Sequence, residues 1–131
     1  GNDTYYLGRG NNDVRAGDGN NLIVVQEYFT GVTNDYIETG SGDDAISTSD
    51  GNDTISAGLG NDTISIANAA TLTLTYTGGL DTVSGTVAAL ILDIDPAATI
   101  DFSAGYLVAT IDAANILTVT GITDIAQVTF I

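Results

Sequence analysis

A short acidic pattern that returns every nine residues constrains the fold of this chain more than any other feature of its sequence. Each copy reads Gly-Asn-Asp-Thr-Ile or a close variant, with an apolar residue two places after the acid. Copies start at Gly1, Gly10, Gly19, Gly42, Gly51 and Gly60, and the phase also holds at Asn34-Asp35-Tyr36-Ile37. A fixed period of this kind predicts a solenoid, in which each repeat buries its apolar side chain only by stacking on its neighbours.

The chemistry of one repeat divides it into a turn and a short strand. Glycines and Asn-Asp pairs permit the tight backbone of the turn, and the segment Thr63-Ile64-Ser65 has the alternation of a strand with Ile64 pointing inward. Two repeats close one coil of eighteen residues, so residues eighteen apart stack. We therefore expect Asp44 to lie over Asp62, and Asp35 over Asp53.

The charge balance limits the partners of such a solenoid. Seventeen Asp and Glu against two Lys and Arg give a formal net charge of −15, and there is no His or Cys. Nucleic acids and anionic membranes need a basic footprint, and no apolar run is long enough for a transmembrane segment. Zinc sites with Cys or His ligands, thiolate nucleophiles and His-dependent triads are excluded as well. A cation with oxygen ligands, above all Ca²⁺, is the expected partner.

The segment from Ala57 to Ser65 matches the nonapeptide Gly-Gly-x-Gly-x-Asp-x-U-x, where U is apolar, except at the first glycine. In this it resembles the repeats-in-toxin (RTX) calcium-binding family, and the resemblance covers residues 1–84. It implies an all-β fold, a right-handed parallel β-roll or β-helix solenoid with calcium-binding turns. It also implies that Ca²⁺ lies between stacked turns, held by the sixth-position acids and by turn carbonyls.

The expected ligands follow from this alignment. They are Asp3, Asn21, Asp35, Asp44, Asp53, Asp62 and Asp81, with the turn glycines Gly40, Gly42, Gly51, Gly58 and Gly60. Asn12 and Asn21 depart from the family pattern because an amide cannot neutralise an ion. We therefore expect the first coils to bind calcium weakly or in part, and the pairs Asp35/Asp53 and Asp44/Asp62 to be the principal sites. A five-residue insertion, Val25 to Phe29, is expected to form a surface loop.

The repeat fades after residue 84, which divides the chain into a calcium-binding β-roll at 1–84 and a second region at 85–131. Acids become sparse there, but apolar residues such as Leu92, Phe102 and Ile111 still recur at intervals of eight to eleven. We expect a metal-poor continuation or cap of the solenoid, with a small β-sandwich as the alternative. The scattered acids of this region show no spacing that selects a catalytic pair, so no enzymatic activity is expected within the chain.

These features favour a calcium-stabilised structural module of a bacterial surface-layer, adhesin or filament protein that folds after secretion. Its solenoid ends are expected to be open and to permit self-association. The alternative is the folding and secretion module of a larger secreted enzyme or toxin, such as a protease, a lipase or an alginate epimerase. A polysaccharide-binding solenoid is the third interpretation. The resemblance implies an extracellular location and type I secretion from a Gram-negative bacterium.

Overall fold

A computed structural model describes residues 1–26 and 32–131, and within them the fold is all-β. The strands are β1 (Thr4–Leu7), β2 (Asp13–Gly17), β3 (Leu22–Val25), β4 (Tyr36–Thr39), β5 (Ala45–Ser56), β6 (Thr63–Thr75), β7 (Leu80–Asp93), β8 (Thr99–Asp101), β9 (Leu107–Asp112), β10 (Asn115–Val119) and β11 (Val128–Phe130). A short 3₁₀ turn, η1 (Ile125–Gln127), precedes β11. The chain winds as a parallel β-solenoid of about 4 turns, as the repeat predicted.

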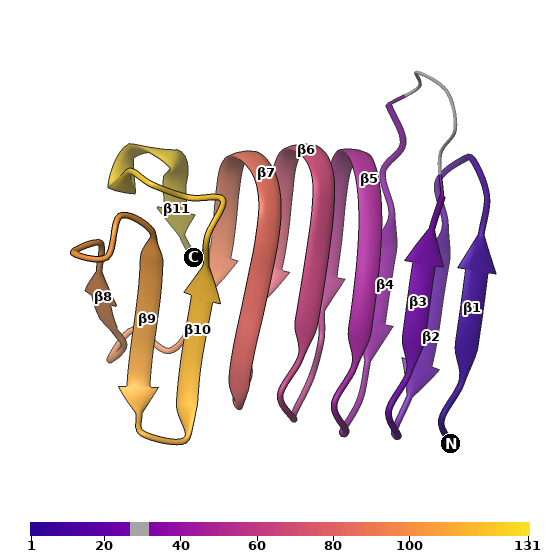
Figure 1. The fold of residues 1–131 in the computed structure, drawn as a ribbon, viewed down its shortest axis with the longest axis horizontal. Coiled ribbons are helices and arrows are strands. Elements are labelled where there is room, and N and C mark those ends of the chain that lie inside the picture. Colours follow the sequence, from indigo (N-terminus) through magenta and orange to yellow (C-terminus); the bar gives the residue numbers. More distant parts are fainter. Residues whose placement is uncertain (27–31) are drawn as a thin grey trace.

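The strands stack side by side along the long axis of the molecule (Figure 1). One flank runs through β1, β3 and the first parts of β5, β6 and β7, and the other runs through β2, β4 and the second parts of the long strands. All these pairings are parallel and align equivalent repeat positions, such as Ile46 with Ile64 and Ile64 with Val83. Because the parallel register aligns the apolar positions of neighbouring strands, the inward-facing side chains all pack into the core.

The spacing between stacked residues shows where the coils differ in length. Asp44 and Asp62 are 18 residues apart, whereas Asn21 and Asp44 are 23 apart. The difference confirms the five-residue insertion between β3 and β4. Val25 itself is the last residue of β3 and is buried, so it does not belong to the loop. The rest of the predicted loop, Glu27 to Phe29, lies outside the described residues.

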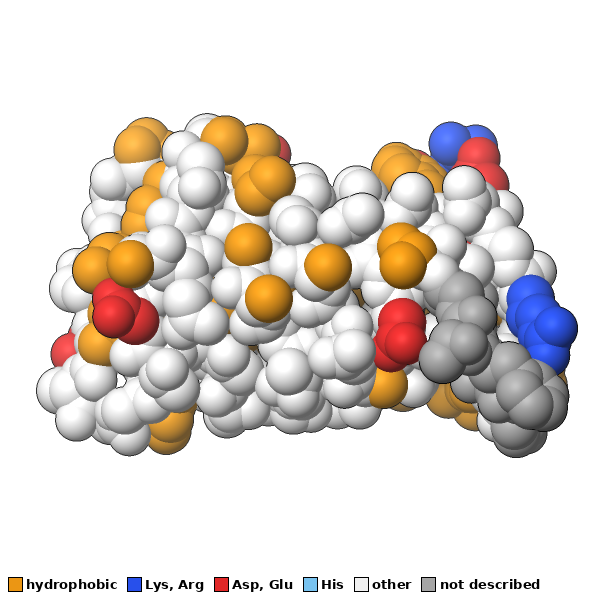
Figure 2. Space-filling view, turned by 90° about the horizontal axis from the view of Figure 1, so that it is seen from above, with side chains coloured by type: hydrophobic (Ala, Val, Ile, Leu, Met, Phe, Trp, Pro, Cys, Tyr) orange, Lys and Arg blue, Asp and Glu red, His pale blue; other side chains and the backbone are white. Residues whose placement is uncertain are grey.

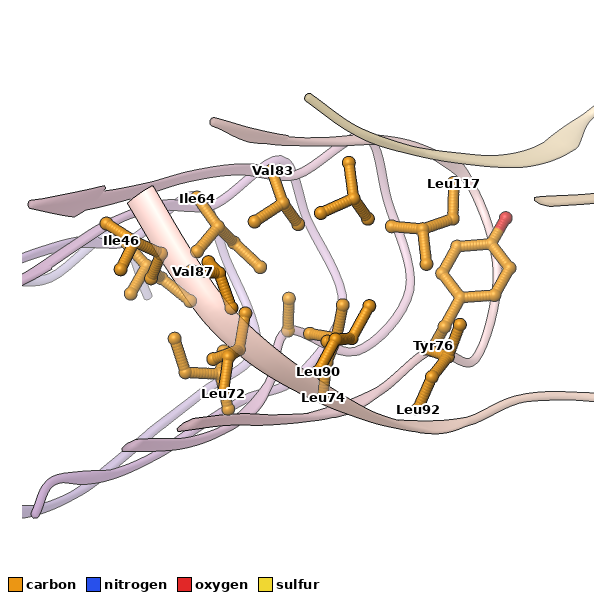
Figure 3. Packing of buried hydrophobic residues seen from close by; sticks show 14 of the residues in the cluster. Ile46, Ile64, Leu72, Leu74, Tyr76, Val83, Val87, Leu90, Leu92 and Leu117 are labelled. Carbon is orange, nitrogen blue, oxygen red and sulfur yellow. The ribbon is translucent and has the colours of Figure 1, made fainter. Parts of the chain in front are cut away.

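The core is a column of branched aliphatic side chains enclosed by the coils (Figure 3). Ile46, Ile64 and Val83 stack from one flank with at most 2% of each exposed. Leu72 and Leu90 stack from the opposite flank with at most 1% exposed. Tyr5, the residue in the inward position of the first repeat, is half-buried against this core.

The last strands cover the C-terminal end of the solenoid. β10 continues the parallel ladder on the first part of β7, and β11 pairs in parallel with its second part, at Leu90 to Leu92. β9 then extends the sheet antiparallel to β10, and β8 pairs antiparallel with β9. The expectation of two open ends is therefore wrong for this end, because both parts of β7 already have partners on the outer side.

The solvent-facing surface is mostly polar and uncharged in one view, with isolated apolar and acidic side chains (Figure 2). The basic side chains in this view lie at the end where the chain begins, as comparison with Figure 1 shows. Arg15 forms ion pairs with Asp13 and Glu38 at 3.4 and 3.5 Å, and its guanidinium lies over the ring of Tyr36. These contacts are exposed and contribute little to stability.

Candidate metal centre

The sixth-position residues of the repeats form two columns, one on each flank of the solenoid. The first column consists of Asp3, Asn21, Asp44, Asp62 and Asp81, and the second consists of Asn12, Asp35 and Asp53. Each residue stands two places before the inward-facing apolar residue of its repeat, either just before a strand or, for Asp53 and Asp81, within one. The parallel register therefore fixes the columns as firmly as it fixes the core.

Hydrogen bonds join each column along its length. The main-chain N–H of Asp44 donates to Oδ1 of Asp62 at 2.8 Å, and that of Asp62 donates to Oδ1 of Asp81 at 2.9 Å. In the other column the N–H of Asp35 donates to Oδ1 of Asp53 at 3.0 Å. The stacking of Asp44 on Asp62 and of Asp35 on Asp53 is as the repeat length predicted.

The second oxygen of these carboxylates is left without such a bond. Asp35, Asp44 and Asp62 are each at most 3% exposed, and their Oδ2 atoms are buried with no hydrogen-bond partner among the described residues. A buried, half-satisfied carboxylate is costly, because neither water nor a donor replaces the lost hydration. Three such atoms in one small protein identify the turns as sites that lack a positive partner.

The pKa values of the first column show the same deficit. Burial raises the pKa of Asp62 to about 6 and that of Asp81 to about 7, with a smaller contribution from the neighbouring carboxylates and against the lowering effect of the main-chain hydrogen bonds that they accept. Each acid is therefore harder to ionise in the folded chain than in water. A bound divalent cation would reverse this effect by favouring the ionised form.

The turn glycines bring main-chain carbonyls into the same space. Gly58 and Gly60 have φ values of 90° and 135°, which residues with a side chain rarely adopt. A Cβ added to Gly58 would lie 1.8 Å from the carbonyl oxygen of Gly40, and one added to Gly60 would lie 2.2 Å from that of Gly42. Only glycine allows the carbonyls of one turn to approach the next turn so closely.

The positions of the remaining predicted site residues differ. Asp3 is exposed at the first end of its column, and Asn21 is buried within it. Gly42 and Gly51 have positive φ and touch the carbonyls of Gly19 and Thr33, whereas Gly40 has an ordinary φ and packs against Asp18. The predicted residues thus lie in two rows of turns, one along each flank, and not in one centre.

A second set of polar residues, at the fifth position, was not predicted to have a role. The side-chain oxygens of Asn20, Asp43 and Asn61 accept hydrogen bonds from the main chain of the next coil, at 2.8 to 3.2 Å. These side chains are exposed and hold adjacent turns together from outside. Their nine-residue recurrence was a signal that could have identified them.

Both columns end in leucine. Leu72 follows Asp53 on one flank, and Leu117 follows Asp81 on the other. Leu72 and Leu117 are completely buried. The change from a carboxylate to an aliphatic side chain lets the last coils close by hydrophobic packing, with no need for an ion.

The available donors fit calcium better than other metals. Among the described residues, no three acidic side chains form a cluster that could hold an ion by themselves. A cation in these turns must therefore take main-chain carbonyls together with one or two carboxylates. Ca²⁺ accepts such mixed oxygen ligands and irregular geometry, whereas Zn²⁺ prefers nitrogen and sulfur.

Comparison with protein families decides the nature of these turns. Residues 1–25 and 29–64 match the model of the RTX calcium-binding nonapeptide repeat, in four copies. Residues 1–64 are RTX calcium-binding repeats. No curated protein and no solved structure is significantly similar to the chain.

The RTX repeats are calcium-binding, and an ion held in these turns would join neighbouring coils. The side chains that would hold it are the buried acids Asp35 and Asp53 on one flank, and Asp44, Asp62 and Asp81 on the other, with carbonyls of the turn glycines. When bound, the ion supplies positive charge to carboxylates that otherwise repel one another across adjacent coils. The chain itself supplies the alignment, because the parallel strands hold the acids in register in the folded solenoid.

Three acids nearer the C-terminus, Asp95, Asp101 and Asp112, have a different structural role. Oδ1 of Asp95, Asp101 and Asp112 accepts the main-chain N–H two residues further on, at 2.8 Å in each case. This is the Asx-turn pattern, which stabilises tight connections. Hydrogen bonds to Ser103 and Asn115, respectively, lower the pKa of Asp101 and of Asp112. These acids are therefore bound within turns and do not converge on a site.

Among the described residues, no helix has the length and the apolar character needed to cross a lipid bilayer.

Proposed function

We propose that this chain is a calcium-stabilised structural module of a secreted bacterial protein, such as a surface-layer, adhesin or filament protein, and that it folds after export. The observation that carries the proposal is the presence, on both flanks, of buried acids whose Oδ2 atoms have no hydrogen-bond partner among the described residues, namely Asp35, Asp44 and Asp62. RTX repeats are typical of secreted bacterial proteins, and their calcium requirement provides a natural delay of folding.

The delay follows from the calcium concentration on each side of the membrane. Extracellular calcium modules bind with dissociation constants of about 10⁻⁴ to 10⁻³ M, far above cytosolic calcium levels. Without the ion, stacked buried carboxylates oppose folding, and the formal charge of −15 adds general repulsion. Outside the cell, the free energy of calcium binding becomes free energy of folding.

The difference between the two regions of the chain supports a structural role. We propose that 1–84 is the calcium-binding part and that 85–131 closes the solenoid with the leucine-lined coils and strands β8 to β11. Such a cap protects the outer edge of β7 from uncontrolled pairing. At the opposite end, β1 and β2 have a partner on one side only, and a second copy would pair through these edges.

Hydrogen exchange measured with calcium and with chelator tests this proposal directly. The main-chain amides of Asp35, Asp44 and Asp62 each donate a hydrogen bond to the buried carboxylate of the next coil. Calcium should therefore slow their exchange by orders of magnitude. Magnesium at the same concentration should not replace calcium. Equal protection of these amides in chelator would contradict the proposal.

The second candidate is the folding module of a larger secreted enzyme or toxin, in which the active site lies in another part of the protein. The capped, self-contained end favours it as much as it favours the structural role. Sedimentation velocity in calcium discriminates between the two roles. Association through the β1 and β2 edges would favour the structural module, whereas a monomer at every concentration would favour the enzyme module.

A further inference from the structure

We infer that the side-chain amides of Asn12 and Asn21 are built-in substitutes for the cation, so the two turns that end at these residues take no calcium. The inference rests on the proposed function and specifies which turns require the ion. It departs from the sequence-based expectation, which placed Asn21 among the calcium ligands.

The contacts of Asn21 determine how its amide is oriented. Nδ2 donates to the carbonyl oxygens of Gly17 and Gly19, at 3.0 and 2.8 Å. Oδ1 accepts the main-chain N–H of Asp3 at 3.0 Å. Rotating the amide by half a turn would place oxygen against two carbonyls and nitrogen against an N–H. The nitrogen therefore faces the carbonyls of its own turn.

Asn12 makes the same arrangement on the opposite flank. Its Nδ2 donates to the carbonyl oxygens of Gly8 and Gly10, at 3.2 and 3.0 Å, and to Oδ1 of Asp35 at 2.9 Å. The nitrogen is thus surrounded by two carbonyl oxygens of its own turn and one carboxylate oxygen of the next coil. Carbonyls and carboxylates from adjacent coils are the ligand types expected for Ca²⁺ in this solenoid.

In the equivalent turn that ends at Asp44, the carboxylate side chain has no N–H donor for the turn carbonyls. Asp44 follows Gly40 and Gly42 by the same four and two residues that separate Asn21 from Gly17 and Gly19. Asp44 also stacks directly on Asn21, whose N–H donates to its Oδ1 at 2.7 Å. However, Oδ2 of Asp44 is buried without a hydrogen-bond partner among the described residues.

Turns with Asn and turns with Asp at the sixth position therefore differ in how their oxygen atoms are satisfied. A neutral amide satisfies the carbonyls with its own N–H donors and adds no charge. A carboxylate adds negative charge and only acceptors, so its turn needs an external cation. Calcium dependence therefore begins at Asp35 and Asp44, and the coils before them are held by asparagine.

Calcium counts on the whole 131-residue chain test the inference. Native mass spectrometry and calorimetric titration, both at millimolar calcium, would compare the wild type with Asn21→Asp and Asn12→Asp. Each substitution should add one bound calcium ion per chain. The matched control is Asn20→Asp, which adds the same charge one residue earlier, on an exposed side chain whose oxygen remains a hydrogen-bond acceptor.

The reverse substitution provides a second measurement if the new acids prevent folding. Asp44→Asn should remove one bound calcium ion and leave a chain that still gives the circular dichroism spectrum of the wild type in calcium. The inference is overturned if Asn21→Asp binds no more calcium than Asn20→Asp, or if Asp44→Asn binds as much as the wild type. A wild type that binds no calcium would instead overturn the proposed function on which the inference rests.

Discussion

At the scale of single residues, the need for calcium comes from carboxylates that are buried in the turns. Asp44 and Asp62 are buried because the strands that follow them carry Ile46 and Ile64 into the core. Their Oδ1 atoms are satisfied by the main chain, and their Oδ2 atoms are left for a cation. The position within the repeat, and not the abundance of acid in the chain, therefore gives these residues their role.

Removing one of these carboxylates should weaken calcium binding and stability together. Asp62→Ala deletes the acceptor of the Asp44 N–H and one ligand for the ion, which predicts a loss of about 1–3 kcal/mol in calcium. Asp43→Ala is the control, because Asp43 also accepts a main-chain N–H but is exposed. Urea unfolding with excess calcium would measure both. A similar loss for the two variants would contradict a special role for the buried acid.

The turn glycines should tolerate no side chain. Gly60→Ala requires φ near 135° and places Cβ 2.2 Å from the Gly42 carbonyl oxygen, so we expect a loss of several kcal/mol in stability, about 3 or more. Gly105→Ala is the control, because Gly105 has a φ of 84° but nothing within 4 Å of an added Cβ. Its cost should be near 1 kcal/mol from backbone strain alone. Thermal unfolding in calcium compares the two, and equal costs would show that the carbonyl contact is unimportant.

At the scale of strands and turns, the first column couples calcium to protons. The pKa values of Asp62 and Asp81 in the folded chain, about 6 and about 7, are above the ordinary value of 3.8. Between those limits the folded, calcium-free chain binds more protons than the unfolded chain. Its stability must therefore rise as the pH falls from about 7 towards 4, and must fall as the pH rises.

This coupling predicts opposite pH effects with and without the ion. In chelator, the β-structure signal in far-UV circular dichroism should be stronger at pH of about 5 than at pH of about 8, because protons replace the missing positive charge. In calcium, the concentration needed for half-saturation should increase at the lower pH, because protons compete for the same oxygens. Asp81→Asn should reduce the effect in chelator. A β-structure signal in chelator that increases with pH would contradict this coupling.

The junction between the solenoid and its cap depends on one asparagine. Oδ1 of Asn115 accepts the N–H of Gly79 at 3.0 Å, and Nδ2 donates to both carboxylate oxygens of Asp112 at 2.9 Å. Asn115→Ala should therefore cost about 1–2 kcal/mol in urea unfolding and leave the number of bound calcium ions unchanged. Asn68→Ala, at an exposed position in β6, should change stability little. A lost calcium ion in Asn115→Ala would show that the cap takes part in the metal site.

At the scale of the whole molecule, the repeat made much of the fold predictable. The nine-residue period placed Ile46 over Ile64 and Asp44 over Asp62, because coil length alone fixes what stacks in a parallel solenoid. The arrangement of the strands in the cap was harder to predict from the sequence. The apolar alternation at Leu107 and Ala109 indicates a strand, but it does not say that β9 runs antiparallel to β10.

Two features of the site also exceeded what a pattern can show. The sequence marks Asn21 as a departure from the repeat, but only the contacts of Nδ2 with Gly17 and Gly19 show the direction of its amide. Similarly, the replacement of Asp by Leu72 is visible in the sequence only once the register to Asp53 is known. Both depend on contacts between coils, which residue type alone does not determine.

The most direct test of the central claim is far-UV circular dichroism during a calcium titration that starts in chelator, with magnesium as the control. If folding depends on calcium, we expect little β structure in chelator at neutral pH, and a cooperative gain of β structure as calcium reaches about 10⁻⁴ to 10⁻³ M. Magnesium should produce no such transition. A full β spectrum in chelator, unchanged by calcium, would show that the buried acids need no cation and would contradict the account.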